Sequence, residues 1–340
     1  MMSSKLVVRI QRNLATNAAS RTSHENTSCS EKYKIRGAKG IFRLIFWAIG
    51  ILLDPLVVYL FYLGDDRKCV QVDKNFGTAI CVVHFVVDII NIVFYSILEL
   101  PADLNESAWI RILLICGNMI IMFPLSLEML ILIHRTKTRT VWNRVALLRY
   151  QMVPRIIRLS ILTAYGSSSS NLALWAIKLL YSYVYSGEVI GSVWYVLAIY
   201  AEARCWQKAC RTHKSGCPDR EFRDRFLPCN ESSEAYKIMN DFCSRNTIEY
   251  DFGVFRDAHQ SGILEMRNFS LKHLFCFRWA MQTISGFGSN IGTASTDVSG
   301  NIFVLCVIYM AVILFYSLIR EMQSDVERRK ERQNRSSNTS

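Results

Sequence analysis

Long stretches without charge are the feature that most constrains the fold. Several runs of about 20 residues between positions 41 and 319 contain very few Asp, Glu, Lys or Arg residues, and this is the helix length that crosses the hydrocarbon core of a bilayer. Apolar types make up 51% of the 340 residues, and the 20% that are charged are unevenly spread. The sequence therefore predicts an all-α integral membrane protein surrounded by lipid, not a soluble globular domain.

Basic residues flank these apolar stretches. The net charge is +12, and most of the Lys and Arg residues lie in 5–43, 134–158 and 320–335. Cationic flanks are typical of the cytoplasmic side of membrane helices, and the interleaved basic and aromatic pattern of a nucleic-acid surface is missing. We therefore expect no nucleic-acid partner. Residues 1–40 and 320–340 are predicted to be cytoplasmic tails, the first disordered and without a secretory signal.

Four apolar segments in 41–164 predict a four-helix module, with spans at about 41–63, 76–98, 112–133 and 145–164. The last of these contains Arg149, Arg155 and Arg158, and charges at membrane depth must face protein or water. A voltage-sensor-like arginine helix satisfies this condition, with Asp88 as a partner, and an interfacial amphipathic helix is the alternative. Two cytoplasmic ends require an even number of crossings, which favours six spans in total, although 134–137 then lies outside against the charge rule.

The second half of the chain, 172–319, has the pattern of a pore module. A fifth span at 172–203 precedes a polar loop at 204–270, a short apolar segment within 271–292 and a last span at 302–319. The segment 271–284 is too short to cross, and such a re-entrant helix is tolerated only where its backbone is buried in protein or lines water. The Gly-rich turn that follows predicts a cation selectivity filter, with a simple turn between helices as the alternative. The filter candidates are Thr283, Ser285, Gly286, Phe287, Gly288, Ser289 and Asn290.

This turn resembles the pore of plant cyclic nucleotide-gated channels, which has approximately the sequence Ser-Ser-Phe-Gly-Gln-Asn-Leu-x-Thr-Ser. Residues 285–294 are Ser-Gly-Phe-Gly-Ser-Asn-Ile-Gly-Thr-Ala, and further similarity lies in Asp54-Pro55-Leu56, Pro154-Arg155, Trp194-Tyr195 and Cys205-Trp206. The resemblance covers about 41–324. It implies a six-span tetrameric cation channel in the plasma membrane that conducts potassium, sodium and also calcium with weak selectivity, and that assembles with related subunits.

Departures from the family pattern leave alternatives open. Family members continue into a linker and a cyclic-nucleotide-binding domain, whereas this sequence stops at Ser340, so nucleotide gating of that kind is not expected. Ser289 replaces a filter glutamine, and Arg320-Glu321 replaces Gly-Asn at the inner mouth, where four arginines would repel cations. The alternatives are a nonconducting truncated subunit that modulates full-length channels, a potassium-selective channel, and a gene model cut short.

Cysteines in the polar loop predict disulfides. If this loop is extracellular, thiols oxidise, so pairing is favoured over a zinc site that includes His213. The candidates are Cys210, Cys217, Cys229 and Cys243, with no pairing deduced, and Asn230 is a glycosylation candidate.

Other reactive groups have structural interpretations. Cys81, Cys116, Cys276 and Cys306 are expected to be packing residues, and His84 with Asp88 on one helix face is expected to be a structural polar pair. No catalytic pattern stands out, so we expect no enzyme activity, cofactor or metal.

Overall fold

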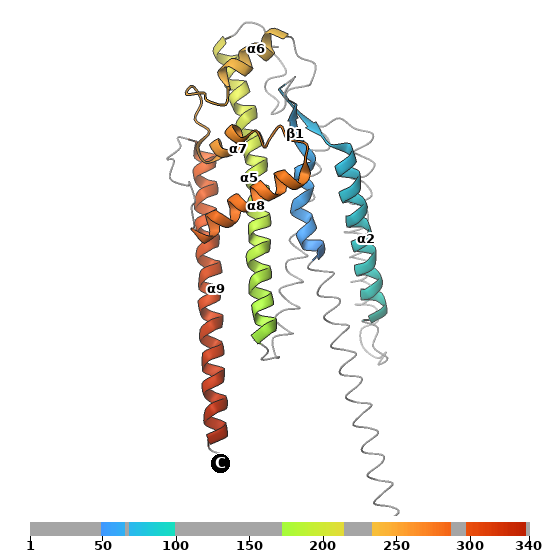
Figure 1. Cartoon of the computed structure of the whole chain (residues 1–340), viewed down its shortest axis with the longest axis vertical. Coiled ribbons are helices and arrows are strands. Elements are labelled where there is room, and N and C mark those ends of the chain that lie inside the picture. The colour runs from blue at the N-terminus through green and yellow to red at the C-terminus, as the bar shows by residue number, and fades with distance from the viewer. Residues whose placement is uncertain (1–48, 65–67, 99–171, 214–232, 287–296, 338–340) are drawn as a thin grey trace, which may run out of the picture.

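The computed structural model describes residues 49–64, 68–98, 172–213, 233–286 and 297–337. Long helices run along the long axis, and the shorter elements of 233–261 lie around one end of them (Figure 1). This end of the molecule is called the crown below. The elements in chain order are η1 (Asp54–Leu60), β1 (Phe61–Gly64), β2 (Cys69–Val72), α2 (Lys74–Leu98), α5 (Leu172–His213), α6 (Ser233–Phe242), η4 (Gly253–Phe255), α7 (Arg256–Ser261), α8 (Phe269–Ser285) and α9 (Val298–Ser337).

The first apolar segment is helical only as far as Leu60. Residues 49–53 are α-helical, and Pro55 in the first turn of η1 fits its fixed φ and missing N–H. β1 then pairs antiparallel with β2, with Phe61 opposite Val72 and Gly64 opposite Cys69. The prediction of a helix to residue 63 in an all-α fold was therefore wrong here. The backbone N–H of Leu63 donates to the carbonyl of Leu264 (2.7 Å), so a distant segment helps to hold this strand.

The helix α2 begins close to the predicted start of the second span. The Asp73 side chain accepts a hydrogen bond from the backbone N–H of Phe76 (3.0 Å) and so caps the first turn. Nδ1 of His84 lies 3.6 Å from Oδ1 of Asp54 on the neighbouring helix, so His84 takes part in a polar pair between helices, and its pairing with Asp88 stays a prediction. Helical spacing shows which residues share a face but not what the adjacent helix contributes. The side chain of Asp88 lies outside what the structure describes.

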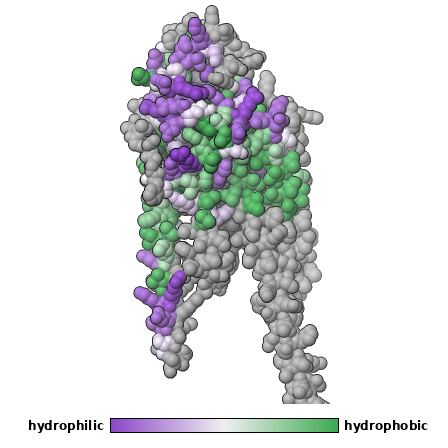
Figure 2. Space-filling model, viewed as in Figure 1, coloured by the Kyte–Doolittle hydropathy of each residue, from purple (hydrophilic) through white to green (hydrophobic). Residues whose placement is uncertain are grey.

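The helix α5 has 42 residues and extends ten residues beyond the predicted end at Ala203. The C-terminal part of α5 is amphipathic, and apolar residues spaced by one and four positions lie on one buried face of the helix. The members of this set are Cys205, Trp206, Ala209 and Cys210. These residues were predicted to begin a loop. Because these side chains are buried in the crown, α5 remains helical beyond the hydrophobic band visible in Figure 2.

The polar segment predicted as a loop at 204–270 is also structured further along. It contains α6, η4 and α7, and apolar side chains from all three pack on the outer part of α5, including Met239, Phe242, Phe255 and Ala258. Figure 2 shows the crown as largely hydrophilic on its surface, above a hydrophobic band. The crown therefore has its own buried core inside a polar shell.

The helix α9 has 40 residues and is longer than the predicted span at 302–319. It continues into the charged tail because Arg, Glu, Lys and Gln are good helix formers. Among the described residues, Leu180–Thr212 and Val298–Glu331 are long and apolar enough to cross a membrane, and Ile49–Leu60 and Lys74–Val87 are shorter apolar helices. The predicted tail at 1–40 and the predicted spans at 112–133 and 145–164 lie outside the described residues.

Candidate functional site: a half-length helix between two long helices

The helix α8 lies across α5 and ends beside α9, well below the point where α9 begins in Figure 1. Its 17 residues start after Asn268, whose side chain accepts a hydrogen bond from the N–H of Leu271 (3.2 Å). They end at Gly286, which has a φ of 72° and a ψ of 1°. This left-handed conformation is strained for residues with a Cβ and is a common helix C-terminus for glycine. The segment predicted as a half-length helix at 271–284 is thus helical over Phe269–Ser285.

Two glycines on α5 allow α8 to approach closely. A Cβ at Gly191 would lie 2.8 Å from the carbonyl oxygen of Cys276, and one at Gly187 would lie 2.7 Å from Sδ of Met281. Small residues four positions apart are a known device for close helix packing in membranes. This pair was not predicted from the sequence, although the Gly-x-x-x-Gly spacing within an apolar helix was a usable signal.

Stacked aromatic rings join the three helices. The rings of Trp194 on α5 and Trp279 on α8 lie 4.4 Å apart at an interplanar angle of 12°, and Trp279 is 6.2 Å from Phe303 on α9. Nε1 of Trp194 also donates to the carbonyl of Val254 (3.1 Å). Offset stacking of buried rings adds to the energy of area burial. The C-terminal half of α8 is therefore held against both long helices.

Polar contacts fix the other end of α8. His273 lies 2.8 and 2.9 Å from the two carboxylate oxygens of Glu188 on α5. Lys272 is fully buried, and its ammonium donates to the carbonyls of Tyr59 and Phe61. None of these three polar side chains was predicted as a site residue, because nothing in the neighbouring sequence indicates a buried partner.

The predicted filter residues are described only in part. Thr283 is buried on α8, Ser285 is exposed and donates from Oγ to the carbonyl of Gln282 (3.2 Å), and Gly286 ends the helix. The other candidates, Phe287, Gly288, Ser289 and Asn290, lie outside the described residues. The structure thus brings Thr283, Ser285 and Gly286 together at the C-terminal end of α8.

The predicted sensor and inner-mouth charges are also described in part. Arg149, Arg155 and Arg158 lie outside the described residues, and Asp88 belongs to α2. Arg320 is exposed on α9, and Glu321 follows it in the same helix.

An ion pair joins α5 to the start of α9. The two terminal nitrogens of Arg204, Nη1 and Nη2, donate to the carboxylate oxygens of Asp297, at 2.9 and 3.1 Å. Asp297 also accepts from Oγ of Ser299 and from the N–H of Gly300, and so caps α9. Burial acts to raise the pKa of Asp297, but the bonds from Ser299, Arg204 and Gly300 outweigh it and lower the pKa.

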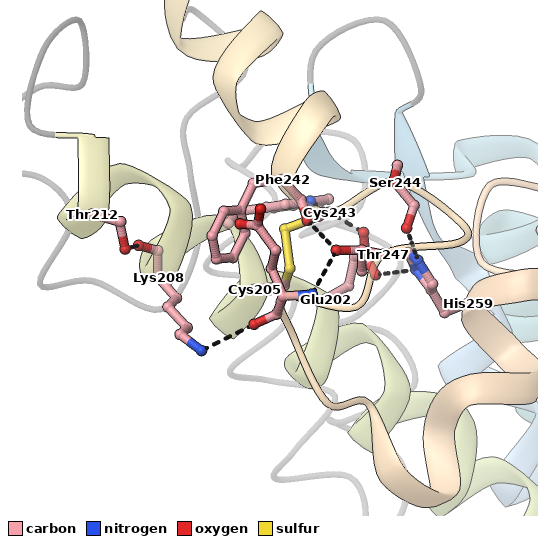
Figure 3. The surroundings of a disulfide bond; sticks show 11 residues. Glu202, Cys205, Lys208, Thr212, Phe242, Cys243, Ser244, Thr247 and His259 are labelled. Carbon is pink, nitrogen blue, oxygen red and sulfur yellow. Dashed lines mark hydrogen bonds and ion pairs between the residues drawn. A yellow bond between two sulfur atoms is a disulfide. The ribbon is translucent and has the colours of Figure 1, made fainter.

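A disulfide stabilises the crown (Figure 3). Cys205 on α5 is bonded to Cys243, which follows α6, and Cys69 and Cys210 are also disulfide-bonded. Of the four predicted cysteines, Cys210 and Cys243 are thus bonded, whereas Cys217, Cys229 and the glycosylation candidate Asn230 lie outside the described residues. Cys69 and Cys205 were not among the predicted disulfide cysteines.

Beside this disulfide, Glu202 and His259 form a buried pair. Nδ1 of His259 lies 2.7 Å from Oε2 of Glu202, and Nε2 lies 3.0 Å from the carbonyl oxygen of Ser244. Nε1 of Trp206 donates to the other oxygen of Glu202 (3.2 Å). Burial acts to lower the pKa of His259, but the hydrogen bond and charge of Glu202 outweigh it and raise the pKa.

Similar proteins come from one class of channel. The chain is 28% identical to probable cyclic nucleotide-gated ion channel 3 of Arabidopsis thaliana over 82% of its length, and 27% identical to cyclic nucleotide-gated ion channel 1 of that plant over 81%. It is 24% identical to cyclic nucleotide-gated ion channel 11 over 81%. The chain spans less than half of the length of these relatives, at 44%, 42% and 49%. No family model and no solved structure matches it.

These relatives confirm the resemblance seen in the sequence. They are named as ion channels, a family not known as enzymes, and channels act in membranes. The similarity extends over about four-fifths of the chain, well beyond the filter motif. The chain is therefore a membrane protein homologous to the plant cyclic nucleotide-gated ion channels.

Proposed function

We propose that the chain is a subunit of a weakly selective cation channel that passes potassium, sodium and also calcium across the plasma membrane. The single observation that carries this proposal is the half-length helix α8, held between α5 and α9 and ended by a left-handed glycine. The relatives named as cyclic nucleotide-gated channels support the same class of function.

In this proposal, Thr283 and residues 285–290 form the selectivity filter. Backbone carbonyls in the turn after α8 would replace part of the hydration shell of a cation. The C-terminal end of α8 carries a partial negative charge, which favours a cation nearby. The exposed side chain of Ser285 and the left-handed backbone of Gly286 are the described groups closest in sequence to that path.

Assembly into a homotetramer, or a heterotetramer with related subunits, would supply four such turns around one axis. The helix α9 supports this, because it exposes a long series of apolar side chains that suit lipid and neighbouring subunits. They include Ile302, Leu305, Tyr309, Val312, Phe315 and Tyr316.

The segment 41–164 is proposed as a voltage-sensor-like module of four spans. The proposed sensor charges are only three arginines, Arg149, Arg155 and Arg158, with Asp88 as their partner. Each charge that crosses the field contributes about 2.3 kcal/mol per 100 mV, so three give weak voltage dependence. With 172–319 as the pore module, the protein has six spans and both tails in the cytoplasm.

A second candidate function is a nonconducting subunit that modulates related full-length channels. Arg320 favours it, because this exposed cation lies on α9 at the predicted inner mouth. Four copies around an axis would repel permeant cations. A potassium-selective pore is the other alternative, favoured by Thr283 before the Gly286-Phe287-Gly288 turn.

Whole-cell current with surface labelling tests the proposal. Cells expressing this chain alone should carry cation current when external sodium, potassium and calcium are exchanged, and Gly288→Ala should abolish that current without loss of surface protein. Gly300→Ala is the matched control, because a Cβ there meets its nearest atom at an ordinary 3.4 Å. Surface protein without current favours the modulatory subunit, and unchanged current in Gly288→Ala removes the filter assignment.

A further inference from the structure

We propose that Lys272 is a positioning residue through which the outer end of the first apolar helix controls the orientation of the pore helix α8. The contact group, called the Lys272 clasp below, consists of Tyr59, Phe61, Tyr195 and Lys272. The inference rests on the proposed channel function, since it assigns a gating role to contacts at the start of α8.

The burial of Lys272 needs an explanation. Its side chain has 0% exposure, and an ammonium group removed from water is costly unless it is hydrogen-bonded. The ammonium donates to the carbonyl oxygens of Tyr59 and Phe61, the latter at 3.2 Å. The Tyr59 carbonyl lies in the last turn of η1, where helix carbonyls lack partners within the helix, and Phe61 is both the C-cap residue of η1 and the first residue of β1. Lys272 thus caps one helix from another that is more than 200 positions away in the sequence.

The electrostatic arrangement favours this cross-helix contact. Lys272 lies near the N-terminus of α8, where the helix dipole disfavours a cation, and it points to the C-terminal end of η1, where the dipole favours one. The ammonium also lies 5.6 Å from the centre of the Tyr195 ring, within the range of a cation–π contact.

Tyr195 adds α5 to the Lys272 clasp. Its hydroxyl donates to the carbonyl oxygen of Phe61 (2.7 Å), the same oxygen that accepts from Lys272. Its ring lies 5.1 Å from that of Tyr59, and both side chains are almost fully buried. Segments from three parts of the chain therefore meet at one carbonyl group.

Neighbouring contacts connect the same turn of α8 to further helices. Phe269 stacks on Phe76 of α2 with 4.3 Å between ring centres, and His273 pairs with Glu188 of α5. The first turn of α8 thus contacts α2, and the residue that follows this turn contacts α5. A displacement of η1 must either move this turn or break the bonds to Lys272.

A purely stabilising role is a poor explanation for the choice of lysine. An apolar residue of similar length would fill the same space without desolvating a charge but would leave the carbonyl of Tyr59 without this donor, and buried ionic groups are weak evidence for stability. A cation aimed at two carbonyls does impose one alignment of η1 relative to α8, since other alignments leave the charge unpaired. Specific alignment is what a contact needs if it is to transmit movement.

Two variants and a control test the proposal in the full chain. Lys272→Met keeps the length and removes the charge, and Tyr195→Phe keeps the ring and removes only the hydroxyl. Arg267→Gln is the control, because Arg267 lies over the Tyr62 ring (5.1 Å) next to the Lys272 clasp but outside it. Single-channel open probability and the sodium-to-potassium permeability ratio are measured with surface labelling.

The expected result is an open probability that falls about five- to tenfold in Lys272→Met and less in Tyr195→Phe, with Arg267→Gln unchanged. The double variant should show less than the summed effect, because both groups bind one carbonyl. Unchanged open probability and permeability in both single variants, with or without lower surface protein, would overturn the proposal. If Lys272→Met fails to reach the surface, Tyr195→Phe alone decides.

Hydrogen exchange on the purified chain separates this inference from the channel function. Amides of 60–64 and 269–275 should exchange faster together in Lys272→Met and Tyr195→Phe, and in neither segment in Arg267→Gln. A wild-type chain without current would remove the proposed conduction while this coupled exchange could still be present. Exchange that rises in one segment alone would overturn the Lys272 clasp, whatever the current.

Discussion

Glu202 and His259 pair across 57 positions of sequence in the crown, with 2.7 Å between carboxylate and imidazole and side chains only 6% and 7% exposed. The other ring nitrogen faces the carbonyl oxygen of Ser244, and the ring stacks on Phe252. Because both ring nitrogens face acceptors, the arrangement is satisfied by the doubly protonated imidazolium. The negative charges acting on it come from Glu202 and, farther away, Glu265.

This pair predicts that the crown is more stable in mildly acidic than in alkaline solution. The pKa of His259 is raised in the folded state, so its contribution is fully present below the ordinary pKa of 6.5 and is lost as pH rises through the raised value. Thermal unfolding of the purified protein across this range should show a fall in midpoint that His259→Gln flattens. An identical pH profile in the variant would contradict the prediction.

Gly191→Ala is expected to displace α8 from α5. The added Cβ would lie 2.8 Å from a backbone carbonyl, which cannot rotate away, and overpacking of this kind costs about 1–3 kcal/mol. The thermal midpoint and the amount of surface protein should both fall. Gly300→Ala serves as the control, since it has room for a methyl group, and equal behaviour of the two variants would argue against close packing at Gly191.

Cys205→Ser is expected to free the thiol of Cys243 and to destabilise the crown. The bond closes a loop with a sequence separation of 38, and loss of such a crosslink costs about 2–4 kcal/mol. Labelling with a thiol-reactive polymer under denaturing conditions without reductant should show one more reactive cysteine than in the wild type, where Cys205 and Cys243 are both bonded. Cys306→Ser, which removes a free exposed thiol, should instead show one fewer. No gain of labelling in Cys205→Ser would mean that Cys243 has another partner or is already free.

The proposed topology predicts a glycan at Asn230. If the crown faces the outside of the cell, the Asn-Glu-Ser sequence at 230–232 is a glycosylation acceptor. Glycosidase treatment should increase the gel mobility of the wild-type protein, and Asn230→Gln should already show that mobility without treatment. If glycosidase treatment does not change the mobility of the wild-type band, there is no glycan at Asn230 to support an extracellular crown.

Much of the helical framework was predictable because it depends on near neighbours. Hydropathy located α2 and the apolar parts of α5 and α9, and the short apolar run followed by glycine located α8 almost to the residue. The ends of α5 and α9 were missed for a related reason. Polar residues continue a helix whenever one face is buried or propensity is high, and hydropathy does not register either condition.

The sequence by itself determined that this chain has long apolar helices, a half-length helix and the motif of a channel family. Only the tertiary structure decided which distant groups meet: Cys205 with Cys243, His84 with Asp54, and Lys272 with the carbonyls of Tyr59 and Phe61. The physical reason is that helix formation and apolar burial are set by residues within one or two turns. The partner of a buried charge or thiol depends instead on how whole helices pack, and local periodicity carries no record of it.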